Sequence, residues 1–396
     1  MKAVSVSDLP FDGLKVVDLS QGVAGPHCGM LMAQHGADVV KVEPPGGDWG
    51  RAIGRQYGDF CAYNVAFNRG KRSVALDLKS AFGLDATRRL LQGADVIIEN
   101  YRPGVLARFA LDYDAICRDN PDVIYVSVTG FGREGPRSSF PATDSILQAF
   151  SGLMSVNRDS GGMPQRVGVL VIDVVTGLYA FQAASTALYR RAIRGGGRHL
   201  SVSLQESIGA VQAAKMIEFH LEGPEGEKAG VPVATYETAD GYLTINARRD
   251  AHFTALCELL GCPELGDDPR FASAVLRREN EAVLMPPLIE RVRGWKSDAL
   301  ADGLAEHDIL HAKVNDYADY FADEHVRSVS SVGWIDHPGT GTIPLHNIPG
   351  LAAPESGSRL ATSPAIGEHT REILTGLALD EAEIDAALAS GTAAGV

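Results

Sequence analysis

The chain has 396 residues, of which 45% are hydrophobic and 22% charged, a composition ordinary for a globular protein with room for two lobes. Its formal net charge is −14, which argues against nucleic acid as a partner because a phosphate backbone requires a basic surface. Any anionic ligand must therefore be held by a local cluster of Lys, Arg and backbone N–H groups.

Strands and helices alternate through the first half of the chain. The apolar run at 14–20 predicts a buried strand, a turn follows at 21–25, and a helix is expected from Pro26 to about His35. A strand at 38–43 completes a β-α-β unit, which indicates a parallel sheet. The same alternation continues with strands at 73–78, 95–100, 123–129 and 198–204 and helices near 81–92, 143–155, 173–193 and 205–221.

The composition changes at 222–232, where Gly, Pro and charged residues are typical of a linker. A strand pair around Asp240 and Gly241 begins a second lobe. Helices are expected in it near 250–261, 279–293 and 297–308, followed by a strand at 331–336 and a helical region at 368–390.

Two glycine-containing turns resemble phosphate-binding loops. Residues 130–135 fit G-x-G-x-x-G after a strand, but Pro136 and polar residues follow where a helix should begin, so we reject a dinucleotide site there. The turn at 21–25 lacks that motif, yet it precedes a helix whose N–H groups suit an anion or a thioester carbonyl. A plain tight turn fits the spacing at 21–25 equally well.

Asp173 interrupts an apolar stretch, VGVLVIDVV, where an ionised group is costly unless it is satisfied. One interpretation is a helix N-cap, because a long helix is expected to begin there. The other is a nucleophilic carboxylate that the N-terminal end of the helix dipole keeps ionised. The two roles are compatible, and the residues alone leave both open.

Basic residues gather near the ends of the second and third expected strands, where an α/β sheet usually binds phosphates: Lys41, Arg51, Arg69, Lys71, Arg72 and Lys79. No histidine spacing indicates a metal site, and the five scattered cysteines form no C-x-x-C pair. Because there is no apolar leader segment and no run of about 18 apolar residues, we expect a cytoplasmic protein without a membrane partner.

Several stretches in consistent order resemble the class III CoA-transferases, a group that includes formyl-CoA:oxalate and carnitine CoA-transferases and α-methylacyl-CoA racemases. They span about residues 11–377 and include DGLKVVDLSQGVAGPHCGMLMAQHGADVVKVEPPGGDWGR, FNRGKRSVALDLKS, ADVIIENYRPGVLARFALDY, NPDVIYVSVTGFGREGP and TDSILQAFSGLMS. Later matching stretches are TADGYLTI, VNDYADYFADEHV and IGEHTREIL.

The resemblance implies a fold and an assembly. It implies an α/β, Rossmann-like large domain with a parallel sheet (1–221 plus 331–396), the linker 222–232, and a small α+β domain at 233–330. Two ring-like chains are expected to interlock as a homodimer.

The resemblance also implies an activity: CoA moves from an acyl-CoA to a carboxylic acid through aspartyl anhydride and aspartyl-CoA thioester intermediates. CoA is a substrate here, and no tightly bound cofactor or metal is expected. The nucleophile is placed at Asp173, and the CoA contacts at Val23, Ala24, Leu76, Lys79, Asn100, Tyr101 and Arg108.

Three departures from the family pattern refine these expectations. Racemase members carry a histidine where this chain has Thr143, and without that acid/base group a transferase is favoured over an acyl-CoA racemase or epimerase. The glycine run of formyl-CoA transferases is reduced to EGPEGEKAG, and Pro44 replaces an arginine that helps hold CoA in the oxalate enzymes. A non-catalytic acyl-CoA binding protein is the alternative from another functional class.

Overall fold

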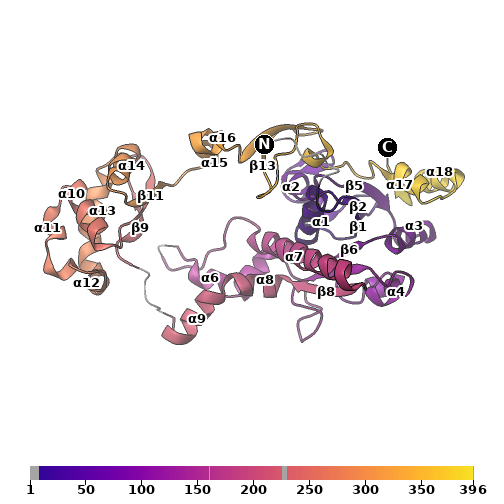
Figure 1. The fold of residues 1–396 in the computed structure, drawn as a ribbon, viewed down its shortest axis with the longest axis horizontal. Helices are drawn as coiled ribbons and strands as arrows, with labels where there is room; N and C mark the ends of the chain where they lie inside the picture. Colours follow the sequence, from indigo (N-terminus) through magenta and orange to yellow (C-terminus); the bar gives the residue numbers. More distant parts are fainter. Residues whose placement is uncertain (1–8, 160, 225–229, 396) are drawn as a thin grey trace. The chain divides into compact units, whose positions relative to one another are not determined.

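The structure, a computed structural model, describes residues 9–159, 161–224 and 230–395 (Figure 1). The chain separates into two compact units. The first takes the chain up to Ala214 together with the chain from Ser330 onward, and the second takes Lys215–Val329. Residues 1–8 of the N-terminal segment, and 225–229 within the predicted linker 222–232, lie outside the described residues.

A seven-stranded sheet forms the centre of the first unit, in the order β14-β5-β2-β1-β6-β7-β8. Six of its strands are parallel, and β14 pairs antiparallel with β5 at one edge. This confirms the predicted α/β class with a parallel sheet. The strands are β1 (Lys15–Asp18), β2 (Asp38–Glu43), β5 (Arg72–Leu76), β6 (Val96–Glu99), β7 (Ile124–Thr129), β8 (Arg198–Ser203) and β14 (Ala393–Ala394).

Helices cover both faces of this sheet (Figure 1). One face packs against α1 (Ala24–Gln34), α5 (Asp144–Phe150), α7 (Val171–Arg194) and α8 (Leu204–Val211). The other packs against α3 (Ala81–Gln92), α4 (Tyr113–Asp119), α17 (Thr370–Gly376) and α18 (Glu381–Ser390). The same unit contains α2 (Ala62–Asn68), α6 (Leu153–Val156) and the hairpins β3 (Gln56–Tyr57) with β4 (Phe60–Cys61) and β12 (Val332–His337) with β13 (Gly341–His346).

Three helix boundaries differ from the prediction. The helix α1 begins two residues before Pro26, and α7 begins two residues before Asp173. The helix expected at 143–155 is interrupted at Gly152, whose φ of 87° is incompatible with a right-handed helix. A helix boundary set by contacts with other elements is not visible in local residue patterns.

The second unit has a three-stranded antiparallel sheet, which includes the predicted strand pair around Asp240. Its strands are β9 (Val233–Glu237), β10 (Tyr242–Asn246) and β11 (Leu310–Lys313). Its helices include α10 (Asp250–Leu259), α11 (Pro263–Gly266), α12 (Ala274–Glu279), α13 (Glu281–Arg293), α14 (Ser297–Glu306), α15 (Tyr317–Ala322) and α16 (Glu324–Ser328). The helix α9 (Ala213–Glu222) spans the boundary between the units in the chain.

By length and composition alone, α7 would be able to cross a membrane, and it is the one helix of the described residues of which this is true. One side of it is core: Ala180 and Ala184 are completely buried against the sheet. The opposite side leaves Tyr189 and Ile193 more than half exposed. The helix is therefore buried on one side only, and its other, apolar side is left uncovered by the described residues of this chain.

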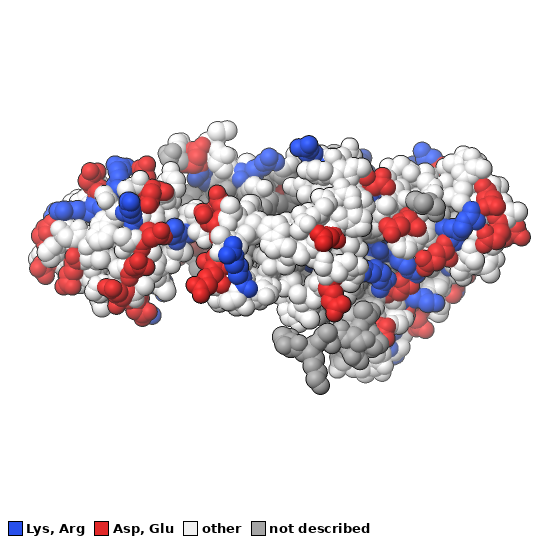
Figure 2. Space-filling model, turned by 90° about the horizontal axis from the view of Figure 1, so that it is seen from above, with Lys and Arg blue, Asp and Glu red and all other residues white. Residues whose placement is uncertain are grey.

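Charged side chains are mixed on the surface. On the face shown in Figure 2, basic and acidic residues alternate among the described residues, and the basic ones do not merge into one broad patch. This face offers no extended track for a polyanion, so an anionic ligand bound here depends on a few local cations.

Candidate functional site

The strand order reverses between β1 and β6, because the chain builds β2 and β5 on one side of β1 and then β6 and β7 on the other. A parallel sheet binds its ligands at such a point, beyond the carboxyl ends of the strands. Here the side-chain amide of Asn100, just after β6, accepts from Gln21 N at 2.8 Å and donates to Gln21 O at 2.7 Å. The Gln21 amide donates in turn to the Tyr101 hydroxyl at 3.2 Å. Two of the predicted CoA-contacting residues thus flank the turn after β1.

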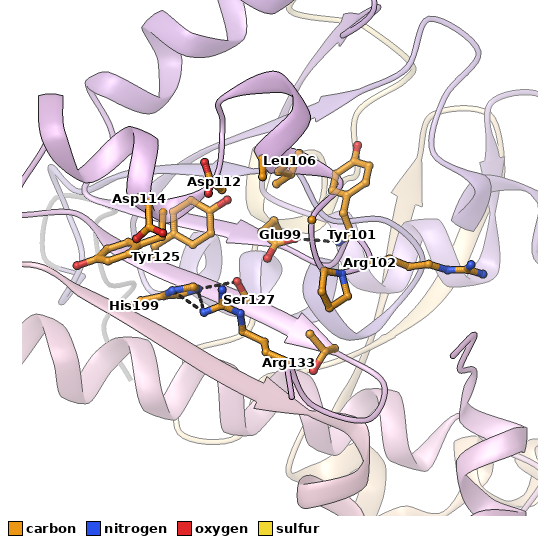
Figure 3. A pocket seen from close by; sticks show the side chains of 15 residues that line it. Glu99, Tyr101, Arg102, Leu106, Asp112, Asp114, Tyr125, Ser127, Arg133 and His199 are labelled. Atoms are coloured by element: carbon orange, nitrogen blue, oxygen red, sulfur yellow. Dashed lines mark hydrogen bonds between the residues drawn. The ribbon is translucent and has the colours of Figure 1, made fainter. Parts of the chain in front are cut away.

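A polar pocket of about 60 Å³ lies beneath the segment that follows β6 (Figure 3). Burial lowers the pKa of His199 to about 4, so its ring is neutral. Arg133 donates to Nδ1 of this ring at 2.8 Å, and Nε2 therefore carries the proton toward Ser127 Oγ, 2.9 Å away. Burial also raises the pKa of the nearby Glu99. A space of this size holds about two waters, so it is too small for a ligand the size of CoA. Sequence reasoning missed it.

The helix α1 presents an uncapped N-terminus at the turn. Val23 is its N-cap residue, and no side chain caps the helix there. Within the described chain, no hydrogen bond engages the N–H groups of Val23, Ala24 or Gly25. Unpaired N–H groups and the helix dipole together make such an end favourable for an anion or a developing oxyanion. Two predicted contact residues, Val23 and Ala24, thus offer open backbone donors.

The start of α1 packs directly on the first turns of α7. A Cβ at Gly177 would lie 2.8 Å from Ala24 O, so only glycine allows this approach. His27 Nδ1 lies 3.0 Å from Val174 O, and burial lowers the pKa of His27 to about 4. The neutral ring must donate from Nδ1, because a carbonyl only accepts. These contacts bring the first turn of α1 against the first turns of α7, the helix that carries Asp173.

Asp173 is the third residue of α7 and is half-buried. Burial is the main cause, and the charge of Asp144 the second, of a pKa raised to about 7. A carboxyl whose pKa is perturbed in this way is the type of group that active sites contain. Its side chain does not cap α7, so the N-cap interpretation left open above is wrong.

The residue that caps α7 is Asp144, at the start of α5. Its carboxylate accepts from Ile172 N at 2.7 Å and from Asp173 N at 3.3 Å, and Gln148 Nε2 donates to it at 2.6 Å. The side chain is only 2% exposed. Sequence reasoning missed this role, because a cap supplied from 28 residues away leaves no local pattern.

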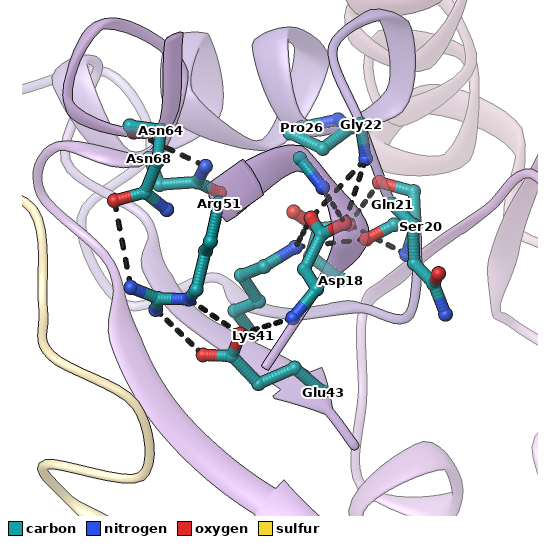
Figure 4. Close-up of polar contacts among 12 residues, drawn as sticks. Asp18, Ser20, Gln21, Gly22, Pro26, Lys41, Glu43, Arg51, Asn64 and Asn68 are labelled. Atoms are coloured by element: carbon teal, nitrogen blue, oxygen red, sulfur yellow. Dashed lines mark hydrogen bonds and ion pairs between the residues drawn. The ribbon is translucent and has the colours of Figure 1, made fainter. Parts of the chain in front are cut away.

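Three of the six basic residues grouped in the sequence are not available to bind phosphate. Lys41, Arg51 and Lys71 are buried and form ion pairs with Asp48, Glu43 and Asp18, respectively (Figure 4). Phosphate binding is excluded for these three because each is already paired with a buried carboxylate, and the sequence alone does not show which carboxylate meets which cation.

The remaining predicted contact residues lie at the same carboxyl edge of the sheet. Leu76 is the last residue of β5 and is buried, and its neighbour Lys79 is exposed in the following turn. Arg108 is exposed in a 3-10 helix at Leu106–Phe109, after β6. Since β5 and β6 are parallel strands of one sheet, their following loops emerge at the same edge. The exposed cations Lys79 and Arg108 thus lie on loops at the same edge of the sheet.

Comparison with known proteins gives a consistent picture. The profile of CoA-transferase family III matches residues 11–370. The chain is 33% identical to succinate–glutarate CoA-transferase of Agrobacterium fabrum, over 93% of this chain and 96% of that one. It is 32% identical to succinyl-CoA–D-citramalate CoA-transferase of Chloroflexus aurantiacus, over 93% and 94%. A crystal structure of a CAIB/BAIF family protein from Brucella suis superposes with a TM-score of 0.83 at 35% identity, covering 93% of this chain and 99% of that one.

Proposed function

The chain belongs to CoA-transferase family III and is a CoA-transferase, and we propose that the carboxylate of Asp173 is its covalent nucleophile. The observation that supports this most strongly is the placement of Asp173. It is a half-buried carboxyl with a raised pKa, on the helix turn against which the uncapped N-terminus of α1 packs. A nucleophile and a set of oxyanion donors are thereby brought together.

The proposed reaction begins when a carboxylate oxygen of Asp173 attacks the thioester carbonyl of the donor. The carbon–sulfur bond breaks, which gives an aspartyl anhydride and CoA thiolate. The thiolate then attacks the aspartyl carbonyl, which releases the donor acid as its carboxylate and leaves an aspartyl-CoA thioester. The acceptor carboxylate attacks this thioester in the same manner, and the thiolate finally takes the new acyl group and restores Asp173. The covalent route divides one difficult exchange into equivalent, easier steps.

The unpaired N–H groups of Val23 and Ala24 are suited to stabilising the oxyanions of the tetrahedral intermediates. Each attack places a negative charge on a carbonyl oxygen, and preorganised backbone donors stabilise that charge without reorganising. Because these donors belong to a helix end, the dipole of α1 adds to the stabilisation.

We propose small dicarboxylic acids as the acids exchanged. Succinate, glutarate and citramalate are the acids in the names of the two relatives compared above. The test is a panel of acyl-CoA donors and carboxylate acceptors, with hydroxylamine added to trap the aspartyl-CoA thioester. Transfer among dicarboxylates together with a hydroxamate at Asp173 is expected. Turnover without any hydroxamate would contradict the covalent route.

Isotope exchange distinguishes a CoA-transferase from an acyl-CoA racemase of the same fold. The residue before Asp144 is Thr143, which cannot move a proton at neutral pH. In deuterium oxide we expect transfer products without deuterium at the α-carbon. Incorporation of solvent deuterium at the rate of turnover would instead establish proton abstraction.

We propose that Lys79 and Arg108 hold the phosphates of CoA. Replacing either with Ala is expected to weaken CoA binding by about 10–100-fold, since a charge-assisted hydrogen bond is worth roughly 1.5–3 kcal/mol. Titration calorimetry at two salt concentrations measures the effect, and wild-type affinity should itself fall with salt. The matched control is Arg118→Ala, because Arg118 is also exposed but lies in the last turn of α4, away from the carboxyl edge. Equal affinity in all three variants would place the phosphate site elsewhere.

We further propose that the protein is an obligate homodimer. Large apolar side chains are exposed along α7, and a hollow of about 600 Å³ is lined by α7, α8 and β8. Exposed apolar patches of this kind mark protein contacts. The unfolding midpoint is expected to rise with protein concentration, and light scattering across a dilution series should find no folded monomer.

The variant Tyr189→Asp tests the same surface, because Tyr189 is 71% exposed in the isolated chain. It should weaken the dimer, whereas Val275→Asp, at an exposed apolar position of the second unit, should not. A stable folded monomer of the wild-type chain, with a concentration-independent midpoint, would contradict the proposal.

A further inference from the structure

The turn between β1 and α1 is held at both ends by buried ammonium groups (Figure 4). Lys41, on β2, donates to Ser20 O at 2.8 Å, and Lys71, just before β5, donates to Pro26 O at 2.8 Å. Both lysines are completely buried. Ser20 lies just before the turn at 21–25 and Pro26 lies in the first turn of α1, so the two lysines fix the backbone on either side of that turn.

Each lysine is paired with an aspartate that also binds the turn. Asp48 lies 2.9 Å from Lys41 Nζ and accepts from Gly22 N at 3.0 Å. Asp18 lies 2.7 Å from Lys71 Nζ and accepts from Ser20 N at 2.9 Å and from the Ser20 hydroxyl. We call these four side chains the lysine clamp: Asp18, Lys41, Asp48 and Lys71.

The backbone is packed so tightly around the clamp that glycines are required. A Cβ at Gly29 would lie 2.7 Å from Asp18 Oδ2, and one at Gly25 would lie 2.3 Å from Ser20 Cβ. Gly22 has a φ of +79°, and a Cβ there would lie 2.3 Å from the Trp49 ring. The turn therefore has little freedom to shift while the clamp is intact.

The clamp side chains bind the carbonyls of Ser20 and Pro26 and the N–H groups of Ser20 and Gly22. The N–H groups of Val23, Ala24 and Gly25 keep no hydrogen-bond partner among the described residues. These donors adjoin the contact between His27 and Val174, which follows Asp173 in the chain. We propose that the lysine clamp is a positioning device for acyl transfer, which holds the α1 donors at the place where the oxyanion forms. This inference rests on the proposed role of Asp173.

A purely stabilising role would not require four buried charges. Removing charges from water is expensive, and well-packed apolar residues of similar size are often as stable or more stable. An ammonium group has a property that apolar groups lack, since one nitrogen can bind a carboxylate and a backbone carbonyl at once. Lys71 uses all three of its donors in this way, on Asp18 Oδ2, Pro26 O and Asn68 Oδ1. The buried charges therefore fix the position of the turn backbone more tightly than apolar side chains would.

Paired, charge-balanced variants test the inference, because removing one partner alone would leave a buried unpaired charge. Asp18→Asn with Lys71→Met releases the Pro26 end, and Lys41→Met with Asp48→Asn releases the Ser20 end. For each pair we expect a dimer that folds, a KM for acyl-CoA that changes less than about threefold, and a kcat about 10–100-fold lower, the effect of misplacing catalytic groups by about 1 Å.

A control pair joins the helix that carries Asp173 to the residue just before β6. Asp95 and Arg191 form an ion pair of 2.8 Å near the other end of α7. Asp95→Asn with Arg191→Met removes two charges from the same unit, and kcat should remain that of the wild type. If all three pairs lowered kcat alike, or if the clamp pairs left kcat unchanged, the clamp would have no positioning role.

Should the paired variants fail to fold, Ser20→Ala provides the second test. It keeps both ion pairs and removes only the hydroxyl that donates to Asp18. We expect kcat to fall about 3–10-fold at unchanged KM, because the variant loses one hydrogen bond that orients the turn. An unaltered kcat would overturn the inference. Asp173→Ala is assayed in parallel. If that variant keeps turnover, the proposed function fails; if it is inactive while Ser20→Ala equals wild type, only the clamp inference fails.

Discussion

Asp173→Ala is expected to abolish CoA transfer while leaving a folded protein that still binds CoA. Loss of a covalent nucleophile lowers kcat by roughly 10⁴-fold or more in enzymes where it has been removed. The substitution takes away a half-buried carboxyl whose side chain makes no helix cap, so the start of α7 should persist through Asp144. Turnover with a matched donor and acceptor measures the activity, and circular dichroism with CoA titration measures the fold and the binding site.

The control for this variant is Asp85→Ala, since Asp85 is an exposed aspartate on α3 of the same unit. It should transfer CoA at the wild-type rate. A tenth of wild-type turnover in Asp173→Ala would be enough to reject the nucleophile assignment. Hydroxylamine should trap a hydroxamate in the wild type and in the control but not in Asp173→Ala.

Activity is expected to depend steeply on pH below neutrality. The pKa of Asp173 is raised to about 7, chiefly by burial, and only the ionised carboxyl attacks a thioester. The value of kcat/KM should therefore fall about tenfold for each pH unit below 7 and level off above it. Asp144→Asn removes the second cause of the shift while keeping an oxygen to cap α7, so the acid limb should move to lower pH. A pH profile that is flat between 5 and 8 would contradict this.

The same pKa has a consequence for stability. A carboxyl whose pKa is raised from 3.8 to about 7 on folding binds its proton more tightly in the folded state. Its contribution to stability is present below about pH 3.8 and is lost as the pH rises to about 7. At pH 8 the variant Asp173→Asn should thus be more stable than the wild type, by roughly 1–4 kcal/mol. Denaturant unfolding at pH 4 and pH 8 measures it, and the difference should disappear at the lower pH.

Strand positions were predictable because each parallel strand is a short apolar run bounded by turns. The run at 38–43 coincides with β2, and those at 123–129 and 198–204 differ from β7 and β8 by one residue at one end. Buried strands of a sheet covered on both faces must be apolar along their whole length, which makes them visible in one sequence.

The details of the site were less predictable because they depend on contacts between distant segments. Asp173 stood out because a charge within an apolar run is locally improbable. Asp144 did not, because its partners lie on another helix. Lys41 and Lys71 stand in the sequence among the basic residues near the strand ends, because a lysine paired with a buried aspartate has the same sequence signature as one that faces solvent. Ion pairs between residues far apart in the chain are visible only in the folded structure.

The edge strand β14 determines the order in which the two units can fold during synthesis. It pairs with β5 and is joined to it further by the bond from Asp77 N to Thr392 O, so the sheet of the first unit gains its last strand from residues made after the whole second unit. During synthesis the second unit, a single continuous segment, can fold as soon as it leaves the ribosome. The first unit must wait with the β5 edge unpaired, and an unpaired edge invites association with other chains. Nascent chains that stop before β14 are therefore those that chaperones should bind longest.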